Sequence, residues 1–269
     1  MLRLLMGEID QVLQGWQGWN VPWTKPPCLE RELAGGSTNR NYLIRADERL
    51  WVLRINGRNS KTIGIDRRRE SAIVKCAAAA GIAPAIAYCS PESGLLITEF
   101  IDGRHWETDE LDDPERLGRL LDLVTRIHEL EVEATPIDYY AHAERYWVQL
   151  VSARFDVPDT LRRERETLLE QLITNHSDKP YTHLCHHDLN PSNIIDQNGR
   201  LYLLDWEYAA YGSPAFDYAS IGAEWGVPIE RLPRYVGIDA AALNDAARLY
   251  QYICRLWALL NEGSSSDQS

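Results

Sequence analysis

Two short segments in the second half of the chain constrain its fold more than any other feature. The first, from Cys185 to Asn193, reads C-H-H-D-L-N-P-S-N, and its apolar approach delivers the acid Asp188 to a tight turn. The second is a short apolar run, Leu203–Leu204, which ends at another acid, Asp205. We therefore expect a strand, a loop and a second strand over 182–205, with both acids and Asn193 at the loop.

An acid, then an amide, then a second acid is the set of groups that phosphoryl transfer from Mg-ATP requires. In this interpretation Asp188 accepts a hydrogen bond from the substrate hydroxyl and aligns it on the γ-phosphate. Asn193 and Asp205 hold Mg²⁺, a hard cation that prefers oxygen ligands. His186 is expected to brace the loop by hydrogen bonding. Each residue alone is better explained by a capped turn or a strand end, but their joint spacing favours the metal site.

The composition narrows the class of partner. The net charge is −12, from 28 Lys and Arg against 40 Asp and Glu, so the chain lacks the basic footprint that nucleic acid requires. An acidic protein attracts cations, which suits a positively charged small substrate. The five scattered cysteines, without a C-x-x-C pair, indicate reduced thiols and a cytoplasmic location. The longest apolar run, from Cys76 to Cys89, is interrupted by glycine and proline, so we expect no membrane insertion.

Hydrophobic periodicity predicts an α+β fold of two lobes. A short helix is expected at 4–15, and a small antiparallel sheet at 29–34, 42–45, 50–55, 85–88 and 95–100, with one helix at 66–80. Beyond a hinge near 99–103, helical spacing predicts helices at 113–131, 139–155, 161–175, 215–225 and 240–262. The polar tail 263–269 is expected to be disordered. These boundaries give an N-terminal nucleotide-binding lobe at 1–101 and a larger helical lobe for catalysis and substrate binding at 102–269.

A glycine-rich loop separates the first two strands of the predicted sheet. Glycines let the backbone approach a ligand closely, and free N–H groups face anions, so the loop is a candidate for the phosphates of ATP. The residues expected to contact the nucleotide there are Gly36, Ser37, Thr38 and Asn39. A Gly-Gly hairpin explains the same sequence equally well.

Arg54 is a charge inside the apolar strand 52–55. Buried charges need partners, and the two candidates are Glu70 on the following helix and the phosphates of ATP. The alternative is an outward-facing arginine on an edge strand. The neighbouring run 67–69, three consecutive arginines, is interpreted as a solvated helix face.

Three segments together resemble the choline/ethanolamine kinase family, within the broader aminoglycoside phosphotransferase and protein-kinase-like fold. They are G-G-S-T-N at 35–39, V-L-R-I at 52–55, with Arg where protein kinases use Lys, and D-W-E-Y at 205–208. The resemblance covers about residues 30 to 262 and implies a small alcohol as substrate instead of a protein. In such a two-lobed kinase, the backbone around Glu99 and Ile101 would bind the adenine.

The resemblance also implies a cation pocket of acids and aromatic faces, which suits a quaternary ammonium. The residues implied near the substrate are Asn190, Tyr208, Glu224, Trp225 and Trp257. Trp257 lies on a helical stripe with Tyr250 and Ile253, which ordinary core packing explains about as well. Cys254 stands where choline kinases tend to place a second aromatic residue, which predicts a more open pocket.

The sequence thus predicts an ATP- and Mg-dependent phosphotransferase for a small cationic alcohol, with choline as the first candidate. A thiamine kinase is the second, because thiamine also offers a cationic ring and a primary alcohol and bacterial thiamine kinases share D-W-E-Y. An aminoglycoside phosphotransferase is a weaker third, since no acidic cluster for a polycation stands out. A nucleotide-binding pseudokinase is disfavoured because Asp188, Asn193 and Asp205 are all present. Whether the chain forms a homodimer is left open.

Overall fold

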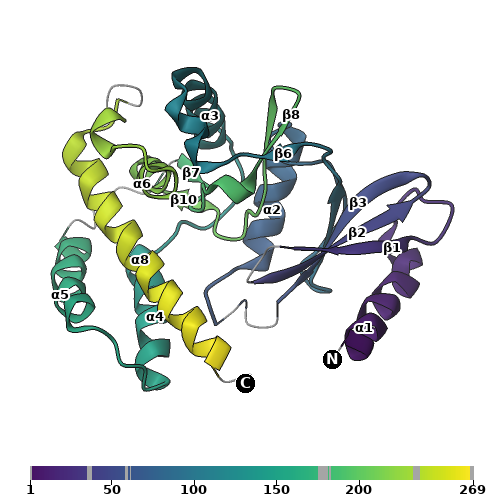
Figure 1. Ribbon diagram of the computed structural model, residues 1–269, viewed down its shortest axis with the longest axis horizontal. Helices are drawn as coiled ribbons and strands as arrows, with labels where there is room; N and C mark the ends of the chain where they lie inside the picture. Colours follow the sequence, from purple (N-terminus) through teal and green to yellow (C-terminus); the bar gives the residue numbers. More distant parts are fainter. Residues whose placement is uncertain are drawn as a thin grey trace.

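A sheet-based lobe and a larger helical lobe lie beside one another in the computed structural model (Figure 1). The structure describes residues 2–34, 38–57, 60, 62–174, 181, 183–232 and 237–266. Within these ranges no helix is both long and apolar enough to span a membrane. The arrangement agrees with the two-lobed α+β fold expected from the sequence.

The small lobe is built on a five-stranded antiparallel sheet with strand order β1-β2-β3-β5-β4. Its strands are β1 (Cys28–Leu33), β2 (Asn39–Ala46), β3 (Arg49–Asn56), β4 (Ile86–Ser90) and β5 (Leu95–Glu99). A two-residue turn at Asp47 and Glu48 joins β2 to β3, and both residues have positive φ, at 45° and 63°. This conformation matches the right-handed twist of the strands and pairs Asn39 with Asn56 at the far end of the hairpin.

The tryptophan-rich N-terminal segment packs on the small lobe. Helix α1 (Leu2–Gln14) and the 3₁₀ turn η1 (Gly15–Trp19) lie at the right of Figure 1, on the side away from the helical lobe. Trp19 stacks on Tyr88 with ring centroids 5.9 Å apart, and Trp23 packs against Trp51 at 5.5 Å. This segment therefore covers sheet surface that water would otherwise reach.

Helix α2 (Arg67–Ala79) ties the two lobes together. It begins at Asp66, whose side chain caps the helix by accepting hydrogen bonds from two backbone N–H groups. Its apolar residues, including Ile73 and Ala77, belong to the same core as the helices of the large lobe. Just beyond the helix, the Ile82 carbonyl accepts a hydrogen bond of 2.9 Å from the Leu203 N–H. Side chains on α2 are therefore held in a fixed position relative to the large lobe.

In the part of the chain that the structure describes, the large lobe contains five longer helices and two short strand groups. The helices are α3 (Pro114–His128), α4 (Tyr139–Ser152), α5 (Asp159–Thr174), α6 (Pro214–Trp225) and α8 (Ala240–Ser266). The strands are β6 (Arg104–His105), β7 (His183–Cys185), β8 (Ile194–Gln197), β9 (Arg200–Leu203) and β10 (Ala210–Gly212). Helix α8 continues to Ser266, so the expectation of a disordered tail from residue 263 is wrong for 263–266. The last three residues lie outside the described ranges.

The chain crosses between the lobes after β5. It runs through 100–103 and enters β6, which pairs with β8 of the large lobe. A Cβ atom at Gly103 would meet the Asp196 carbonyl oxygen at 2.6 Å, so only glycine permits this close backbone approach. The predicted hinge segment 99–103 therefore passes directly beside the β8–β9 hairpin that precedes Asp205.

Candidate active site

A cavity of about 1200 Å³ lies between the lobes and is lined by residues of both. From the small lobe come one face of the sheet and the crossing segment. From the large lobe come the loop after β7, the segment after β9 and part of α8. The predicted site residues that line the cavity are Thr38, Arg54, Glu70, Glu99, Ile101, Asp188, Asn190, Asn193, Asp205, Tyr208 and Trp257.

Asp217 on α6 fixes the backbone that leads to Asp188. Its carboxylate, fully buried, accepts hydrogen bonds from the N–H groups of His186 (3.0 Å) and His187 (2.8 Å) and contacts His128 Nε2 at 3.0 Å. Burial acts to raise the pKa of Asp217, but His128 and the N–H donors outweigh it and lower the pKa to about 2. The carboxylate thus stays ionised and holds the loop, whose turn at His187 has a φ of 67°.

His186 joins the two acid-bearing segments, as the sequence predicted. Its Nδ1 accepts a hydrogen bond of 3.3 Å from the Asp188 N–H. Its Nε2, which then carries the hydrogen, donates to the Leu204 carbonyl at 3.0 Å. Burial lowers the pKa of His186 to about 4, so the ring is neutral at pH 7 and the hydrogen positions are fixed.

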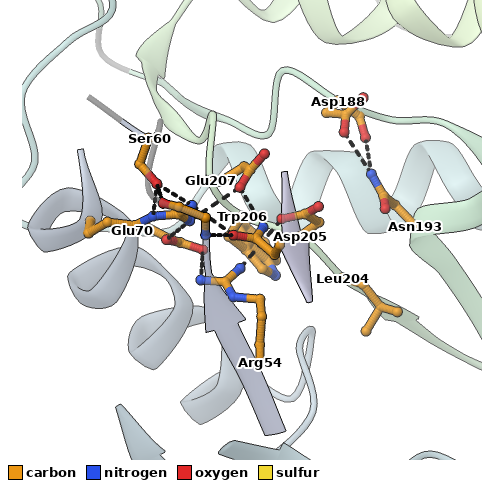
Figure 2. A network of polar contacts seen from close by, with 12 residues as sticks. Arg54, Ser60, Glu70, Asp188, Asn193, Leu204, Asp205, Trp206 and Glu207 are labelled. Carbon is orange, nitrogen blue, oxygen red and sulfur yellow. Dashed lines mark hydrogen bonds and ion pairs between the residues drawn. The ribbon is translucent and has the colours of Figure 1, made fainter. Parts of the chain in front are cut away.

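Asp188 accepts one hydrogen bond on each carboxylate oxygen. Asn190 Nδ2 donates to Oδ1 at 2.9 Å. Asn193 Nδ2 donates to Oδ2, also at 2.9 Å (Figure 2). Burial raises the pKa of Asp188 to about 6, because these hydrogen bonds only partly offset the loss of water. The carboxylate is therefore ionised at pH 7 and is a stronger hydrogen-bond acceptor than an ordinary aspartate.

The residues predicted to hold Mg²⁺ leave neighbouring strand ends. Ile194 pairs with Leu203, and the Leu204 N–H donates to the Asn193 carbonyl at 2.8 Å, which brings Asn193 beside Asp205. Asn193 Nδ2 donates to both the carbonyl and the carboxylate of Asp188. The Oδ1 atom of Asn193 has no hydrogen-bond partner among the described residues.

This donor set fits a hard cation. The amide oxygen of Asn193 and the carboxylate of Asp205 are the oxygen ligands that Mg²⁺ takes from proteins, with phosphates and water completing its shell. Burial, and after it the charge of Glu207, raises the pKa of Asp205 well above its usual range, while Arg54 opposes the rise. A bound cation would stabilise a carboxylate in this position.

Arg54 on β3 is paired as predicted. Its NH2 lies 2.5 Å from Glu70 Oε1 on α2, and its NH1 lies 3.5 Å from Asp205 Oδ1. Burial acts to lower the pKa of Arg54, but Glu70 and Asp205 outweigh it and raise the pKa, so the guanidinium stays charged. The arginine faces the cavity, where its positive charge can meet an anion as well as the two acids.

The run of arginines at 67–69 is not simply a solvated face, which corrects the prediction. The Arg67 side chain is only 11% exposed and donates to Glu70 at 2.8 Å, to Glu207 at 3.2 Å and to Asn39 Oδ1 at 2.8 Å. Arg68, by contrast, has an 82% exposed side chain. The sequence signal that was missed is the spacing of Arg67 and Glu70, which places them one turn apart on the same helical face.

Aromatic side chains form the wall of the cavity beyond Asp188. The Tyr208 hydroxyl lies 3.2 Å from the Tyr146 hydroxyl, and the Tyr146 ring lies 5.7 Å from the ring of Trp257. Tyr250, also on this wall, donates a hydrogen bond of 2.8 Å to Glu224. Trp257 packs on the core of α4, α5 and α8 and also lines the cavity. Cys254 lies on the same wall.

Sequence reasoning missed part of this wall. His142 and Tyr146 are one turn apart on α4, and both line the cavity. Burial lowers the pKa of His142 to about 3, so it is neutral and adds no positive charge that would repel a cation. Their spacing marked a buried helical face, but nothing in the sequence showed that this face meets Tyr208.

Several predicted residues are placed elsewhere. Trp225 is 4% exposed, packs edge-on against Trp106 and donates to the Leu189 carbonyl at 2.9 Å, so it supports the loop from behind. Among the described residues, Glu224, Trp225 and Asn39 are not part of the cavity lining. Gly36 and Ser37 lie outside the described residues.

Comparison with known proteins agrees with this geometry. The model of the phosphotransferase enzyme family matches residues 30–252. Among curated proteins, the chain is 28% identical to mouse ethanolamine kinase 2 over 286 residues, which covers 91% of this chain and 72% of the relative. It is 26% identical to Protein LicA of Haemophilus influenzae over 197 residues, or 70% of this chain and 56% of the relative. The chain thus spans little more than half the length of that relative.

Solved structures show the fold. The crystal structure of choline kinase LicA from Streptococcus pneumoniae superimposes with a TM-score of 0.76 at 19% identity, over 96% of this chain and 92% of that one. This confirms the predicted two-lobed fold, and the family match confirms the resemblance inferred from the sequence motifs.

The raised pKa of Asp188 predicts how stability depends on pH. Between the unfolded value of 3.8 and the folded value of about 6, the folded protein keeps a proton that the unfolded chain loses, so this residue's contribution to stability declines as pH rises. The variant Asp188→Asn should therefore be more stable than the wild type above pH 6, by about 1–3 kcal/mol, and the gain should shrink toward pH 4. Urea unfolding between pH 4 and pH 8 measures it.

Asp196 supplies a matched control of opposite sign. Burial acts to raise its pKa, but the Gly199 N–H, Arg119 and Trp106 outweigh it and lower the pKa. Asp196→Asn should therefore lose stability at neutral pH. An Asp188→Asn protein no more stable than the wild type at pH 8 would contradict the account of the Asp188 environment.

Proposed function

Because the chain belongs to the phosphotransferase enzyme family, we propose that it transfers the γ-phosphoryl group of ATP to the hydroxyl of a small cationic alcohol, with choline as the first candidate. One observation carries the proposal. Asp188 lies in a single cleft between a small-lobe face that carries Arg54 and a large-lobe wall of aromatic side chains. An acceptor on the aromatic wall and a nucleotide on the small-lobe face would meet at this carboxylate.

The small-lobe side suits the nucleotide. The segment at Glu99 and Ile101 lines the cavity at the crossing between the lobes, where its backbone would meet an adenine edge. Arg54, held by Glu70, lines the cavity and would meet the phosphates, and Thr38 lies at the end of the glycine-rich segment. When bound, Mg²⁺ would neutralise charge on the transferring phosphates, and Asn193 and Asp205 are the residues that would hold it.

Asp188 would orient the acceptor hydroxyl. The hydrogen bonds from Asn190 and Asn193 fix its carboxylate, so a hydroxyl that donates to it is aligned in one direction. Phosphoryl transfer depends mainly on such positioning and on charge stabilisation, with little covalent work for the protein. With a pKa near 6, Asp188 also accepts the hydroxyl proton at neutral pH.

The aromatic wall favours a compact cation. A quaternary ammonium needs no hydrogen-bond acceptors and is attracted to ring faces, which Tyr146, Tyr208 and Trp257 supply. Glu224, held by Tyr250, adds negative charge near the wall. A polycationic aminoglycoside would require several more acids, and the described lining beyond Asp188 is mostly aromatic and aliphatic. Thiamine and ethanolamine remain the alternatives that the experiment must separate from choline.

The first experiment is a coupled assay of ADP release with choline, ethanolamine, thiamine and an aminoglycoside as acceptors. We expect the highest kcat/KM with choline. A higher value with another acceptor would replace choline as the substrate, and ATP binding without turnover on any of them would favour the pseudokinase.

Replacement of the catalytic carboxylate tests the mechanism. Asp188→Ala should lower kcat by about two to four orders of magnitude, because the variant can neither align the hydroxyl nor accept its proton. The Kd for ATP, measured by calorimetry, should change little. Full activity in Asp188→Ala would exclude this residue as the hydroxyl-orienting group.

Replacement of Trp257 tests the cation pocket. Trp257→Ala should raise KM for choline by about threefold to thirtyfold, the range expected for one cation–π contact, with KM for ATP unchanged. Trp257→Phe keeps an aromatic face and should recover most of the affinity. An equal loss in both variants, or a change in KM for ATP alone, would place the cation elsewhere.

A further inference from the structure

Glu207 has no part in the steps described above, although it lies two residues beyond Asp205. Its carboxylate belongs to the polar network drawn in Figure 2 and is almost fully buried, at 2% exposure. A buried carboxylate is costly unless donors satisfy it, so its partners indicate its purpose. Among the residues that the structure describes, the donors to Glu207 both come from the other lobe.

The two donors are Asn39 and Arg67. Asn39 Nδ2 donates to Glu207 Oε2 at 2.7 Å, and Arg67 NH1 reaches the same oxygen at 3.2 Å. The two donors also bind one another, because Arg67 NH2 donates to Asn39 Oδ1 at 2.8 Å. These three side chains therefore form a closed triangle, which we call the Asn39–Arg67–Glu207 latch.

The latch connects the two parts of the site that must agree in position. Asn39 is the first residue of β2 and directly follows the glycine-rich segment 35–38. Arg67 opens α2 and also holds Glu70, the partner of Arg54. Glu207 is carried by the segment that presents Asp205. A single carboxylate of the large lobe thus fixes the start of β2 and the start of α2.

A role as a metal ligand is the alternative for Glu207. Its side chain is 3% exposed, whereas that of Asp205 is 31% exposed. The oxygen Oε2 is already occupied by two donors. Glu207 also lines the cavity, but its low exposure and its two donors favour a group that holds protein over a group that meets a ligand.

We propose that Glu207 is a positioning residue, which acts through Asn39 and Arg67 to hold the start of β2 and the start of α2 in place beside the metal-binding segment of the large lobe. The inference rests on the proposed function in one respect, that the cleft takes ATP. Since the latch acts on nucleotide binding, its loss should raise the Kd for ATP even without Mg²⁺. Loss of a metal ligand would instead act only when Mg²⁺ is present.

A polarity swap tests the latch. Asn39→Asp sets two carboxylates against one another, and Glu207→Gln replaces the carboxylate that Arg67 and Asn39 face by a neutral amide. Each single variant should raise the Mg-free Kd and the KM for ATP by about tenfold to a hundredfold, the range for one hydrogen bond to a charged group, with a smaller change in kcat. The double variant Asn39→Asp, Glu207→Gln restores an amide facing a carboxylate and should return both constants to within about threefold of the wild type.

Glu92→Gln is the matched control. It removes an exposed ion pair of 3.4 Å with Arg68, which lies next to Arg67 on α2. The Mg-free Kd and the KM for ATP should both stay unchanged. Thermal unfolding of each variant separates loss of binding from loss of fold. If Asn39→Asp fails to fold, Asn39→Ala replaces it in the same cycle with Glu207→Gln, and a combined effect smaller than the product of the single effects supports the latch.

Three results would overturn the proposal. They are additive effects in the cycle, unchanged ATP affinity in a destabilised Glu207→Gln, and a defect in Glu207→Gln that appears only with Mg²⁺ and is not rescued at position 39. A wild type that binds ATP but phosphorylates no alcohol would contradict the proposed function alone. A wild type that binds no ATP would contradict both.

Discussion

The structure depends on a cluster of charges buried between its lobes. Arg54 and Arg67 of the small lobe face Glu70, Asp205 and Glu207, and the shortest contact, between Arg54 and Glu70, is 2.5 Å. Burying such charges is costly unless each has a partner of opposite charge. Removing one partner leaves the other as a buried charge whose desolvation cost is no longer compensated. The cluster therefore restricts how the two lobes can meet. It lies at the position where an anionic nucleotide would bind.

A second buried acid plays the equivalent part inside the large lobe. Asp217 holds the backbone of the loop before Asp188, and the neutral His186 ties that loop to Leu204. The carboxylate that would orient the acceptor and the carboxylate that would hold Mg²⁺ are thus linked through one imidazole ring. Precise placement of this kind is what phosphoryl transfer asks of a protein, because most of its catalysis is positioning and electrostatics.

Much of this could be predicted from the sequence where a residue's chemistry leaves few choices. A charge in an apolar strand, Arg54, required an acid, and Glu70 on the next helix is that acid. Contacts between lobes could not be predicted, because helical spacing shows which residues share a face but not what the face meets. The sequence therefore suggests a solvated Arg67, although its side chain is only 11% exposed and forms an ion pair with Glu207. Trp225 and Trp257 differ in the same way, since only the packing of α6 and α8 places one behind the loop and the other at the cavity.

The central claim is that the cleft brings a cationic alcohol and the γ-phosphate of ATP together at Asp188. Phosphorus NMR of the protein with ATP, Mg²⁺ and choline tests it most directly, because the spectrum identifies the product. The account predicts a new phosphomonoester resonance that grows as the γ-phosphate resonance declines, and that is absent when choline or the protein is omitted. Conversion of the γ-phosphate to inorganic phosphate alone, with no phosphomonoester from any cationic alcohol, would contradict it.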